Sequence, residues 1–526
     1  MAFASRTGLS QTVYKRVPHS EDEDIPLVLE SSDTEDDTLY EISDKVKDKT
    51  NDRGHQPVYT VEEAVEAIGF GWFQIRLYVV CGVISATDAL EMMLLAVMSP
   101  VVRCEWSLTD AEVALVTTVV FVGMGLSAPL LGYIGDKYGR KFTLMLVTLC
   151  IGYFGLLTSL SPTYYWVLIL RGLVGVGMGG SPQGTSLLSE YIPRKYRAKT
   201  LIFGQVFWAT GIMFEIFLAA VIIPTIGWRW LLVFSAVPSL LSAMGLLFVP
   251  ESARFLLAAG KRDEAISLLE KAARVNKSRL PDGQLVRSAE VERGKFSNLF
   301  SPEYKRTTLQ LWVLWFTMAF FYYGMVLASA EILRKYSPDG NKGQKCHCNF
   351  LTGKDYTTML LSTMGEFICL PVNMVLIDWL GRRKNAAFNL FMAAILVLII
   401  QLDMPRSVFT IVLFCIRGFS AAFGNLLYIY SSEIYPTTIR TLGMGTASAW
   451  ARVGAMTTPF IAQVLLSRSL SLACWIYAVV CFLCSLCAYF MPIETKERAL
   501  PQSVSMEMIA LKTMDEEDGK SEEEMD

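Results

Sequence analysis

The chain has 526 residues, of which 52% are hydrophobic and only 18% charged, and its mean hydropathy is +0.38. Soluble domains carry about 25% charged residues, and a net charge of −3 provides no basic face for nucleic acid. The eleven cysteines are scattered, mostly within apolar stretches, so this is no disulfide-stapled scaffold. These features exclude an ordinary soluble enzyme, a disordered scaffold and a nucleic-acid-binding protein. They favour a protein that crosses a lipid bilayer several times.

Twelve apolar stretches are long enough to cross the bilayer core of about 30 Å as helices. They are too long, and too uniformly apolar, for the alternating strands of a membrane β-barrel. The sequence therefore predicts an all-α membrane protein with twelve transmembrane helices. The expected helices span 73–99, 112–133, 142–160, 164–186, 201–224, 230–249, 308–330, 356–378, 386–404, 408–430, 441–466 and 471–491.

Three polar segments lie outside these helices. Residues 1–58 and 501–526 are acidic and lack a helical apolar period, so we expect disordered cytoplasmic tails. The first of them has no basic and apolar signal peptide, so helix 1 is expected to direct membrane insertion. Residues 251–307 form a hydrophilic linker with one amphipathic helix expected over 262–275. The two membrane domains are then 59–250 and 308–500.

The distribution of lysine and arginine indicates the orientation, because cytoplasmic loops carry an excess of both. With the N-terminus in the cytoplasm, the inside connections hold 23 of these residues and the outside connections hold nine. Both ends of the chain and the linker are therefore expected on the cytoplasmic side. The outside connection between helices 7 and 8 is unusually basic for this assignment.

The membrane region contains an internal repeat, in which four motifs recur in the same order. Parallel halves with a path between them are a transporter architecture, so we expect two six-helix halves. The paired motifs are Gly135–Lys141 with Ile377–Lys384, Arg171-Gly172 with Arg417-Gly418, Glu190–Arg197 with Glu433–Arg440, and Pro250-Glu251-Ser252 with Pro492-Ile493-Glu494-Thr495.

These motifs resemble those of the major facilitator superfamily, in particular its sugar and organic-ion porter branch. The resemblance is closer to the synaptic vesicle 2-related (SVOP-like) transporters, and it covers about residues 59–500. It implies transport by alternating access, in a cytoplasmic, synaptic-type vesicle membrane or in the plasma membrane. The segments that carry this closer similarity are Tyr59–Ala64, Gly69-Phe70-Gly71, Asp88–Met93, Gly227–Trp230, Ser432–Pro436 and Arg452–Ala455.

Charged residues at the cytoplasmic helix ends are candidates for a gate. Opposite charges there can lock the two halves together, and breaking them would permit the opposite opening. The simpler interpretation is that the basic residues only fix the topology. The gate candidates are Asp136, Arg140, Glu190 and Arg197 in the first half, and Asp378, Arg382, Glu433 and Arg440 in the second.

Asp88 and Glu91 stand in the middle of the otherwise apolar helix 1, three residues apart and therefore on one face. A carboxylate inside the bilayer costs several kcal/mol unless it is paired, hydrated or protonated, and neighbouring carboxylates oppose each other's ionisation. The pair is a candidate proton site, or a site that attracts a cation. The alternative is a structural ion pair with Arg171 or Arg452.

Other intramembrane side chains are candidates for the binding of a solute or for proton coupling. The resemblance links Arg171 to proton-coupled transporters, although a structural pairing fits this residue equally well. The buried charges Glu215, Glu366 and Arg452 are candidates by the same energetic argument. Aromatic residues more often fill packing positions, so the polar and aromatic candidates are the weaker set. That set is Gln183, Trp208, Tyr322 and Asn425.

Two further features bear on cofactors. Cys346-His347-Cys348 lacks the fourth ligand of a zinc site, so a disulfide with Cys104, or no role at all, is the preferred interpretation. The sequence has no P-loop and no nucleotide-binding domain. We therefore expect no cofactor, no metal and no enzymatic activity.

Two functions from different classes remain. The first is a secondary or facilitative transporter of a small organic ion or metabolite, driven by a proton gradient or by the solute's own gradient. The second is a non-transporting vesicle membrane protein, a receptor or trafficking partner built on a transporter scaffold. In either case the lipid bilayer is a partner, and the acidic tails are available to sorting adaptors.

Overall fold

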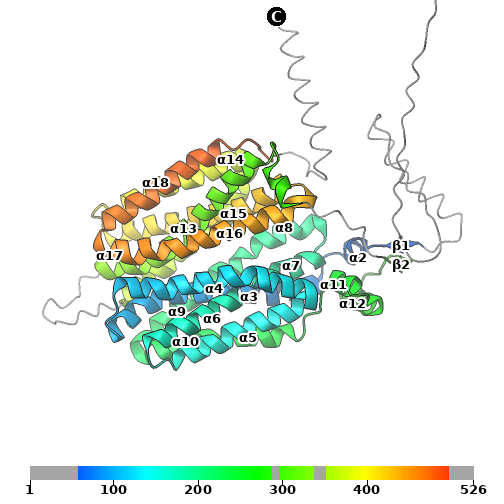
Figure 1. The fold of residues 1–526 in the computed structure, drawn as a ribbon, viewed down its shortest axis with the longest axis horizontal. Helices are drawn as coiled ribbons and strands as arrows, with labels where there is room; N and C mark the ends of the chain where they lie inside the picture. The colour runs from blue at the N-terminus through cyan, green and yellow to red at the C-terminus, as the bar shows by residue number, and fades with distance from the viewer. Residues whose placement is uncertain (1–56, 287–294, 337–350, 497–526) are drawn as a thin grey trace, which may run out of the picture. The chain divides into compact units, whose positions relative to one another are not determined.

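The computed structural model describes residues 57–286, 295–336 and 351–496. The packing separates the chain into two units. One contains residues 57–58 and Asp282–Gln284, and the other contains the remaining described residues. The helices belong to this second unit, and Figure 1 shows them as two bundles, α3 to α10 and α13 to α18.

The first bundle follows a short helix, α2 (Val61–Ile68), whose N-cap Thr60 forms a capping box with Glu63. The bundle itself consists of α3 (Trp72–Glu105), α4 (Asp110–Tyr138), α5 (Arg140–Ser159), α6 (Tyr164–Met178), α7 (Pro182–Tyr191), α8 (Arg194–Phe203), α9 (Gln205–Thr225) and α10 (Trp228–Leu246).

The linker contains the helix expected from its amphipathic pattern. The preceding helix α11 (Ala253–Ala258) leads into that helix, α12 (Arg262–Asn276), and a short 3₁₀ helix, η1 (Phe296–Phe300), lies just before the second bundle. Two short strands, β1 (Val58–Tyr59) and β2 (Gln284–Leu285), pair with each other.

The second bundle begins with the long helix α13 and ends with α18. Its elements are α13 (Lys305–Tyr336), α14 (Gly353–Ile399), α15 (Arg406–Ile434), α16 (Thr437–Pro459), the π-helix η2 (Phe460–Leu465), α17 (Leu466–Arg468) and α18 (Leu470–Tyr489).

Among the described residues, nine helices are long and apolar enough to cross a membrane. One of them, α14, holds two of the expected helices, because Gly381 has φ +76° and divides it at a kink. The expected helix 4 is interrupted and forms α6 and α7. The expected helix 11 is α16 with η2, where glycines and Arg452 lower the hydropathy. With these corrections to the boundaries, the twelve-helix, all-α membrane fold is confirmed.

The interruption of helix 4 is explained by Pro182, which has no N–H to donate to the carbonyl of Met178, the last residue of α6. At the same place a Cβ on Gly179 would lie 2.1 Å from the Oγ of Ser127, so glycine allows α6 and α4 to approach closely. Pro182 then begins α7, as proline favours the first turn of a helix.

Helix α3 is the most enclosed part of the first bundle, because every residue from Thr87 to Pro100 is buried. A helix that is apolar all round is expected in such a position. Asp88 and Glu91 lie within this buried stretch, far from either end of α3, so their carboxyl groups need partners inside the bundle.

The two ends of the bundles are named as follows. The end that carries α11 and α12 is the linker end. The opposite end, with the 106–109 and 400–405 connections, is the distal end.

Candidate functional site

Each bundle contains one deeply buried ion pair. In the first, Nη1 of Arg171 on α6 lies 2.6 Å from Oε2 of Glu91 on α3, with side chains 1% and 3% exposed. In the second, Nη2 of Arg417 on α15 lies 2.6 Å from Oε1 of Glu366 on α14, with 4% and 5% exposed. A buried charge is tolerated when it is paired in this way, so the two pairs neutralise three of the predicted intramembrane charges, with Arg417 of the repeated motif as the fourth partner.

A chain of hydrogen bonds connects the second pair to the first bundle. Trp208 on α9 donates its Nε1–H to the Oη of Tyr322 on α13 at 2.7 Å. Tyr322 in turn donates to the carboxylate of Glu366 at 3.1 Å, and the guanidinium of Arg417 lies over the Tyr322 ring. The aromatic candidates Trp208 and Tyr322 thus join the two bundles at a charged site.

Asp88 and Glu91 do not share one partner, although they share one helix face. Oδ1 of Asp88 accepts a hydrogen bond from the Oγ of Ser181 at 2.9 Å. Ser181 lies in the interruption between α6 and α7, so the break in helix 4 gives the carboxylate its donor. The sequence pattern did not indicate this serine.

Glu215 on α9 is completely buried, with 0% exposed. Its Oε2 accepts a hydrogen bond from Ser235 of α10 at 2.8 Å, whereas its Oε1 has no partner among the described residues. Glu91 and Arg171 are within electrostatic range. The first bundle therefore holds a third acidic group beside its ion pair.

The polar candidates Gln183 and Asn425 do not join the buried ion pairs. Oε1 of Gln183 accepts a hydrogen bond from Nη1 of Arg140 at 3.0 Å, which places Gln183 at the linker end and away from the buried pairs. Asn425 on α15 is half-buried, and the structure records no hydrogen bond of its side chain with a described residue.

The repeated motifs of the first bundle assemble into one cluster at the linker end. Arg140 contacts Asp136 at 3.2 Å and Glu190 at 3.6 Å. Glu251 accepts the backbone N–H of Lys141 at 3.0 Å at the start of α5. Ser252 donates its hydroxyl to Glu190.

The second bundle repeats this arrangement. Arg382 contacts Glu433 through Nε at 2.9 Å and Nη2 at 2.8 Å. Glu494 accepts the backbone N–H of Arg382 at 2.8 Å, and Thr495 donates its hydroxyl to Glu433. Residues at equivalent positions of the internal repeat thus make equivalent contacts in the two bundles.

The remaining gate candidates also have their contacts within one bundle. Arg197 donates to the carbonyl of Ile192 at 3.3 Å, and Arg440 donates to that of Tyr435 at 3.2 Å. Asp378 is exposed. In this conformation the recorded partners of the gate candidates therefore lie in their own bundle, and a lock between the halves stays a prediction.

Glu190 lies beyond the apolar part of helix 4, and its carboxyl is largely enclosed. Burial raises the pKa of this carboxyl above its usual value, while the Ser252 hydrogen bond and the Arg140 and Arg254 guanidiniums oppose that rise. The linker-end cluster of the first bundle is thus partly desolvated.

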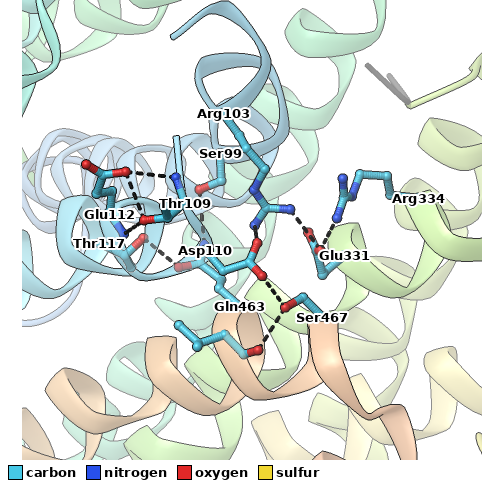
Figure 2. A network of polar contacts seen from close by, with 11 residues as sticks. Ser99, Arg103, Thr109, Asp110, Glu112, Thr117, Glu331, Arg334, Gln463 and Ser467 are labelled. Carbon is cyan, nitrogen blue, oxygen red and sulfur yellow. Dashed lines mark hydrogen bonds and ion pairs between the residues drawn. The ribbon is translucent and has the colours of Figure 1, made fainter. Parts of the chain in front are cut away.

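A polar network joins the two bundles at the distal end, and Figure 2 shows it. Nη1 of Arg103, at the end of α3, contacts Oε1 of Glu331 on α13 at 3.0 Å. Nη2 of Arg103 lies 3.3 Å from Asp110, which accepts a hydrogen bond from Ser467 of α17. These four residues come from both bundles, so they close this end.

Gln463 of η2 extends the same network toward the membrane interior. It donates to the Oγ of Ser99 at 3.1 Å and lies 3.4 Å from the hydroxyl of Thr117. We call Arg103, Asp110, Glu331, Gln463 and Ser467 the distal network. In the sequence Arg103 is only one of the nine basic residues of the outside connections, and nothing there indicates that it meets Glu331.

Cys104, next to Arg103, is disulfide-bonded. Cys346 and Cys348, for which a disulfide with Cys104 was considered, lie outside the described residues. Disulfides persist in oxidising compartments, so this bond fits a distal end that faces away from the cytosol. Among the described residues no group of three metal-ligating side chains is present.

Two bundles of membrane helices with repeated linker-end motifs and a buried ion pair in each define a membrane transporter of the major facilitator fold. The chain belongs to the sugar (and other) transporter family, whose profile matches residues 87–505. It is 44% identical to the "Synaptic vesicle 2-related protein" of Pongo abelii over 85% of this chain and 83% of that protein. It is 43% identical to the human "Putative transporter SVOPL" over 84% and 93% respectively.

The fold also matches solved structures. The xylose transporter XylE from E. coli, in an inward open conformation, gives a TM-score of 0.62 at 16% identity, over 81% of this chain and 98% of that one. A D-xylose-proton symporter gives 0.60 at 16% identity, over 80% and 98%. At this level of identity the likeness shows the fold.

Proposed function

We propose that this protein is a secondary transporter that moves a small organic ion or metabolite across a membrane by alternating access. The family membership supports the class of activity, and the named relatives are described as transporters or as vesicle 2-related proteins. We take the solute path to run between the two bundles, at the level where Trp208 of the first meets Tyr322 of the second.

The observation that carries the proposal is the buried charge in both bundles. The Glu91–Arg171 and Glu366–Arg417 pairs are each about 95% buried or more, and ionic groups in a membrane interior generally mark a substrate or proton path. The Trp208–Tyr322 hydrogen bond joins the bundles at this level. A scaffold that only presented its tails to partners would have no need of such groups.

Alternating access requires contacts between the bundles that form at one end and break at the other. The distal network supplies them in the present conformation. The linker-end charges Asp136, Arg140, Asp378 and Arg382 would close the other end in the alternate state. The present partners of Arg140 and Arg382 lie within their own bundles and Asp378 is exposed, so these side chains are available for contacts between the bundles in that state.

Proton coupling is the driving force that the site favours. Glu215 has one carboxylate oxygen without a described partner, and it lies within electrostatic range of the Glu91–Arg171 pair. When Glu215 carries a proton, Arg171 would stay paired with Glu91 alone. When Glu215 loses that proton, its carboxylate would compete with Glu91 for the guanidinium of Arg171. Asp88, held by one hydroxyl, is the second candidate proton site.

The membrane that we propose for this protein is that of a cytoplasmic, synaptic-type vesicle, with both ends of the chain in the cytosol. The names of the vesicle 2-related relatives and the charge bias of the loops support this location. The acidic tails, outside the described residues, would then be accessible to sorting adaptors.

Purified protein in sealed vesicles tests the proposal. A metabolite library is offered with and without an inward proton gradient, and accumulation is measured by mass spectrometry. We expect uptake of at least one organic solute that the gradient increases and that Glu91→Gln abolishes. Empty vesicles and Arg229→Gln, a change in an exposed pair with Glu105, are controls. Failure of every solute would favour a receptor or trafficking role.

A further inference from the structure

Two arginines of the second bundle meet at the C-terminal end of α18, on the outer surface of the linker end. Nη2 of Arg306, near the start of α13, donates to the carbonyl of Phe490 at 2.9 Å. Nη2 of Arg383, just after the kink in α14, donates to the carbonyl of Tyr489 at 2.8 Å. Because the two acceptors are consecutive residues, the two guanidiniums lie close to each other.

Capping of α18 accounts for only part of this arrangement. The last carbonyls of a helix carry partial negative charge, and arginine is a good donor to them. A guanidinium has five N–H donors, however, and the contacts above use one in Arg306 and one in Arg383. Nε of Arg383 is buried and has no partner among the described residues.

The positive charge at this place is also not neutralised by an ion pair. No carboxylate oxygen of a described residue lies within 4.0 Å of either guanidinium. Glu494 is near Arg383 in the fold, but its carboxylate accepts the backbone N–H groups of Arg382 and Arg383 instead. The end of α18 provides about half a negative charge, so two full positive charges leave an excess.

Exposed aromatic side chains accompany the two arginines. Tyr489 and Phe490 are both exposed, with ring centroids 5.4 Å apart. Trp379, one turn before Arg383 along the chain, is exposed as well. Aromatic residues are enriched where a membrane protein meets the lipid headgroups. This end of the second bundle therefore has the composition of a membrane–water boundary.

Exposed aliphatic side chains continue from the arginines toward the membrane interior. Leu309 and Val313 follow Arg306 on one face of α13, and Leu486 precedes Phe490 by one turn on α18. The helices α13 and α18 pack against each other. In a membrane protein such an exposed apolar face is in contact with lipid chains. The surface is thus cationic at its linker end and apolar beyond it.

We propose that Arg306 and Arg383 bind the phosphate group of an anionic phospholipid, with an acyl chain lying along Leu309, Val313 and Leu486. Arginine matches the geometry of a phosphate through parallel N–H donors. An anionic lipid would supply the negative charge that the described residues do not. The adjoining apolar face favours a lipid over a phosphate ion in solution, because an ion would gain nothing from that face.

The internal repeat offers a comparison within the same chain. Lys141 is the counterpart of Arg383, and its Nζ donates to the carbonyl of Leu247, at the end of α10, at 3.2 Å. Lysine acts as a point charge and lacks the planar fork of arginine. The proposed site therefore belongs to the second bundle, where two arginines take part.

Lipid binding is measured on the purified full-length protein in detergent. Native mass spectrometry counts the bound lipids, and the unfolding temperature reports the stabilisation that they provide. The lipid probes are dioleoyl phosphatidylserine and, as the zwitterionic reference, dioleoyl phosphatidylcholine. We expect phosphatidylserine to bind at least about tenfold more tightly, because each nearby cation strengthens the binding of an anionic lipid several-fold. Inorganic phosphate and glycerol 3-phosphate, at the same concentration, should neither displace the lipid nor raise the unfolding temperature.

Substitutions assign the preference to the two arginines. We expect the double variant Arg306→Gln, Arg383→Gln to bind both lipids equally. Glutamine keeps an N–H donor for the end of α18, where Gln310 also donates to the Phe490 carbonyl at 3.4 Å. The matched control is Lys271→Gln, Arg274→Gln, which removes two exposed charges from α12 and should bind as the wild type does.

A second variant covers the case in which the glutamine variant unfolds. Arg306→Lys, Arg383→Lys keeps both charges and loses the fork geometry, so its preference for phosphatidylserine should lie below that of the wild type. A preference equal to that of the wild type in this variant would contradict a phosphate held by arginine.

Three other results would overturn the inference. Equal affinity of the wild type for the two lipids would show that there is no anionic-lipid site. An equal loss of preference in the α12 control would reduce the effect to general attraction by a positive surface. Displacement of the lipid by glycerol 3-phosphate would show a site for soluble phosphates. None of these results bears on transport, which is tested separately by uptake.

Discussion

Arg103 at the end of α3 forms an ion pair with Glu331 of α13 at 3.0 Å, and the two residues belong to different bundles. The Arg103 side chain is 12% exposed and the Glu331 side chain 4%. A pair with so little solvent screening contributes more than an exposed one. Since Arg334 also contacts Glu331 and Asp110 contacts Arg103, this connection holds the distal end closed (Figure 2).

Breaking this connection should shift the protein toward a state that is open at the distal end. We expect Arg103→Gln to raise the labelling rate of a cysteine introduced at Thr117 by a reagent applied from the distal side. A shift of a few kcal/mol between states is sufficient for a several-fold change in rate. Arg229→Gln is the matched control, because Arg229 pairs with Glu105 at 2.8 Å at the same end but within one bundle. Equal labelling of both variants would show that the Arg103 pair does not hold the bundles together.

Linker-end glycines should be intolerant of a side chain. Gly139 and Gly381 occupy equivalent positions in the repeat, with φ of +106° and +76°, where non-glycine residues are strained. A Cβ would lie 2.2 Å from a Glu251 oxygen and 3.0 Å from the Glu494 carboxylate respectively. We expect Gly139→Ala and Gly381→Ala each to lower the thermal unfolding temperature.

The control for these two variants is Gly132→Ala in the same region. Gly132 has no positive φ, and no other group lies within 4 Å of the position that an alanine methyl would occupy. Alanine also has the higher helix propensity. If Gly132→Ala unfolds at a temperature as low as the other two variants, then the carboxylate contacts are not the cause.

The orientation prediction can be checked directly. Lys271 is exposed on α12 of the linker, so Lys271→Cys should react with a membrane-impermeant thiol reagent added to sealed vesicles isolated with their cytosolic face outward. The reason is the excess of positive charge on this side. A cysteine replacing exposed Arg468 is the counterpart at the distal end and should react only after the vesicles are permeabilised. The opposite pattern would reverse the topology.

Much of the fold can be predicted from the sequence. The length of each apolar stretch indicates a membrane helix, and the recurring motifs indicate the internal repeat. The sequence also proposed Arg171 as a partner of Glu91, and the structure brings these two together. It did not predict the break of helix 4 before Pro182, because an apolar run is judged by its hydropathy and the run continues through the proline. The close packing of Gly179 on α4 involves residues distant in sequence, and periodicity cannot indicate it.

The same limit explains the missed parts of the site. Arg103 and Glu331 are 228 positions apart, so one sequence offers no sign that they meet. Nothing in the sequence distinguishes Ser181 and Ser235 from other serines of the membrane region, and only the three-dimensional arrangement makes them donors to Asp88 and Glu215. Gln183 is a case in which the sequence suggested a role that the structure does not support. Its position in helix 4 suggested a place in the solute path, but its side chain contacts Arg140 at the linker end.

The last prediction concerns whether the Glu91–Arg171 pair is needed for folding, for function or for both. Removing one partner leaves an uncompensated charge at a site that is 1–3% exposed, and such a change costs about 3–5 kcal/mol. We therefore expect Arg171→Gln to lower the unfolding temperature strongly, and Glu91→Gln to do so as well. The double variant Glu91→Gln, Arg171→Gln leaves two neutral amides that can hydrogen-bond to each other. It should regain most of the lost stability while uptake stays absent. Vesicle uptake and thermal unfolding are measured on the same preparations, with the Glu366–Arg417 pair left intact as an internal reference. Restored uptake in the double variant would show that the pair is purely structural, and the proposed role in transport would then have to pass to Asp88 and Glu215.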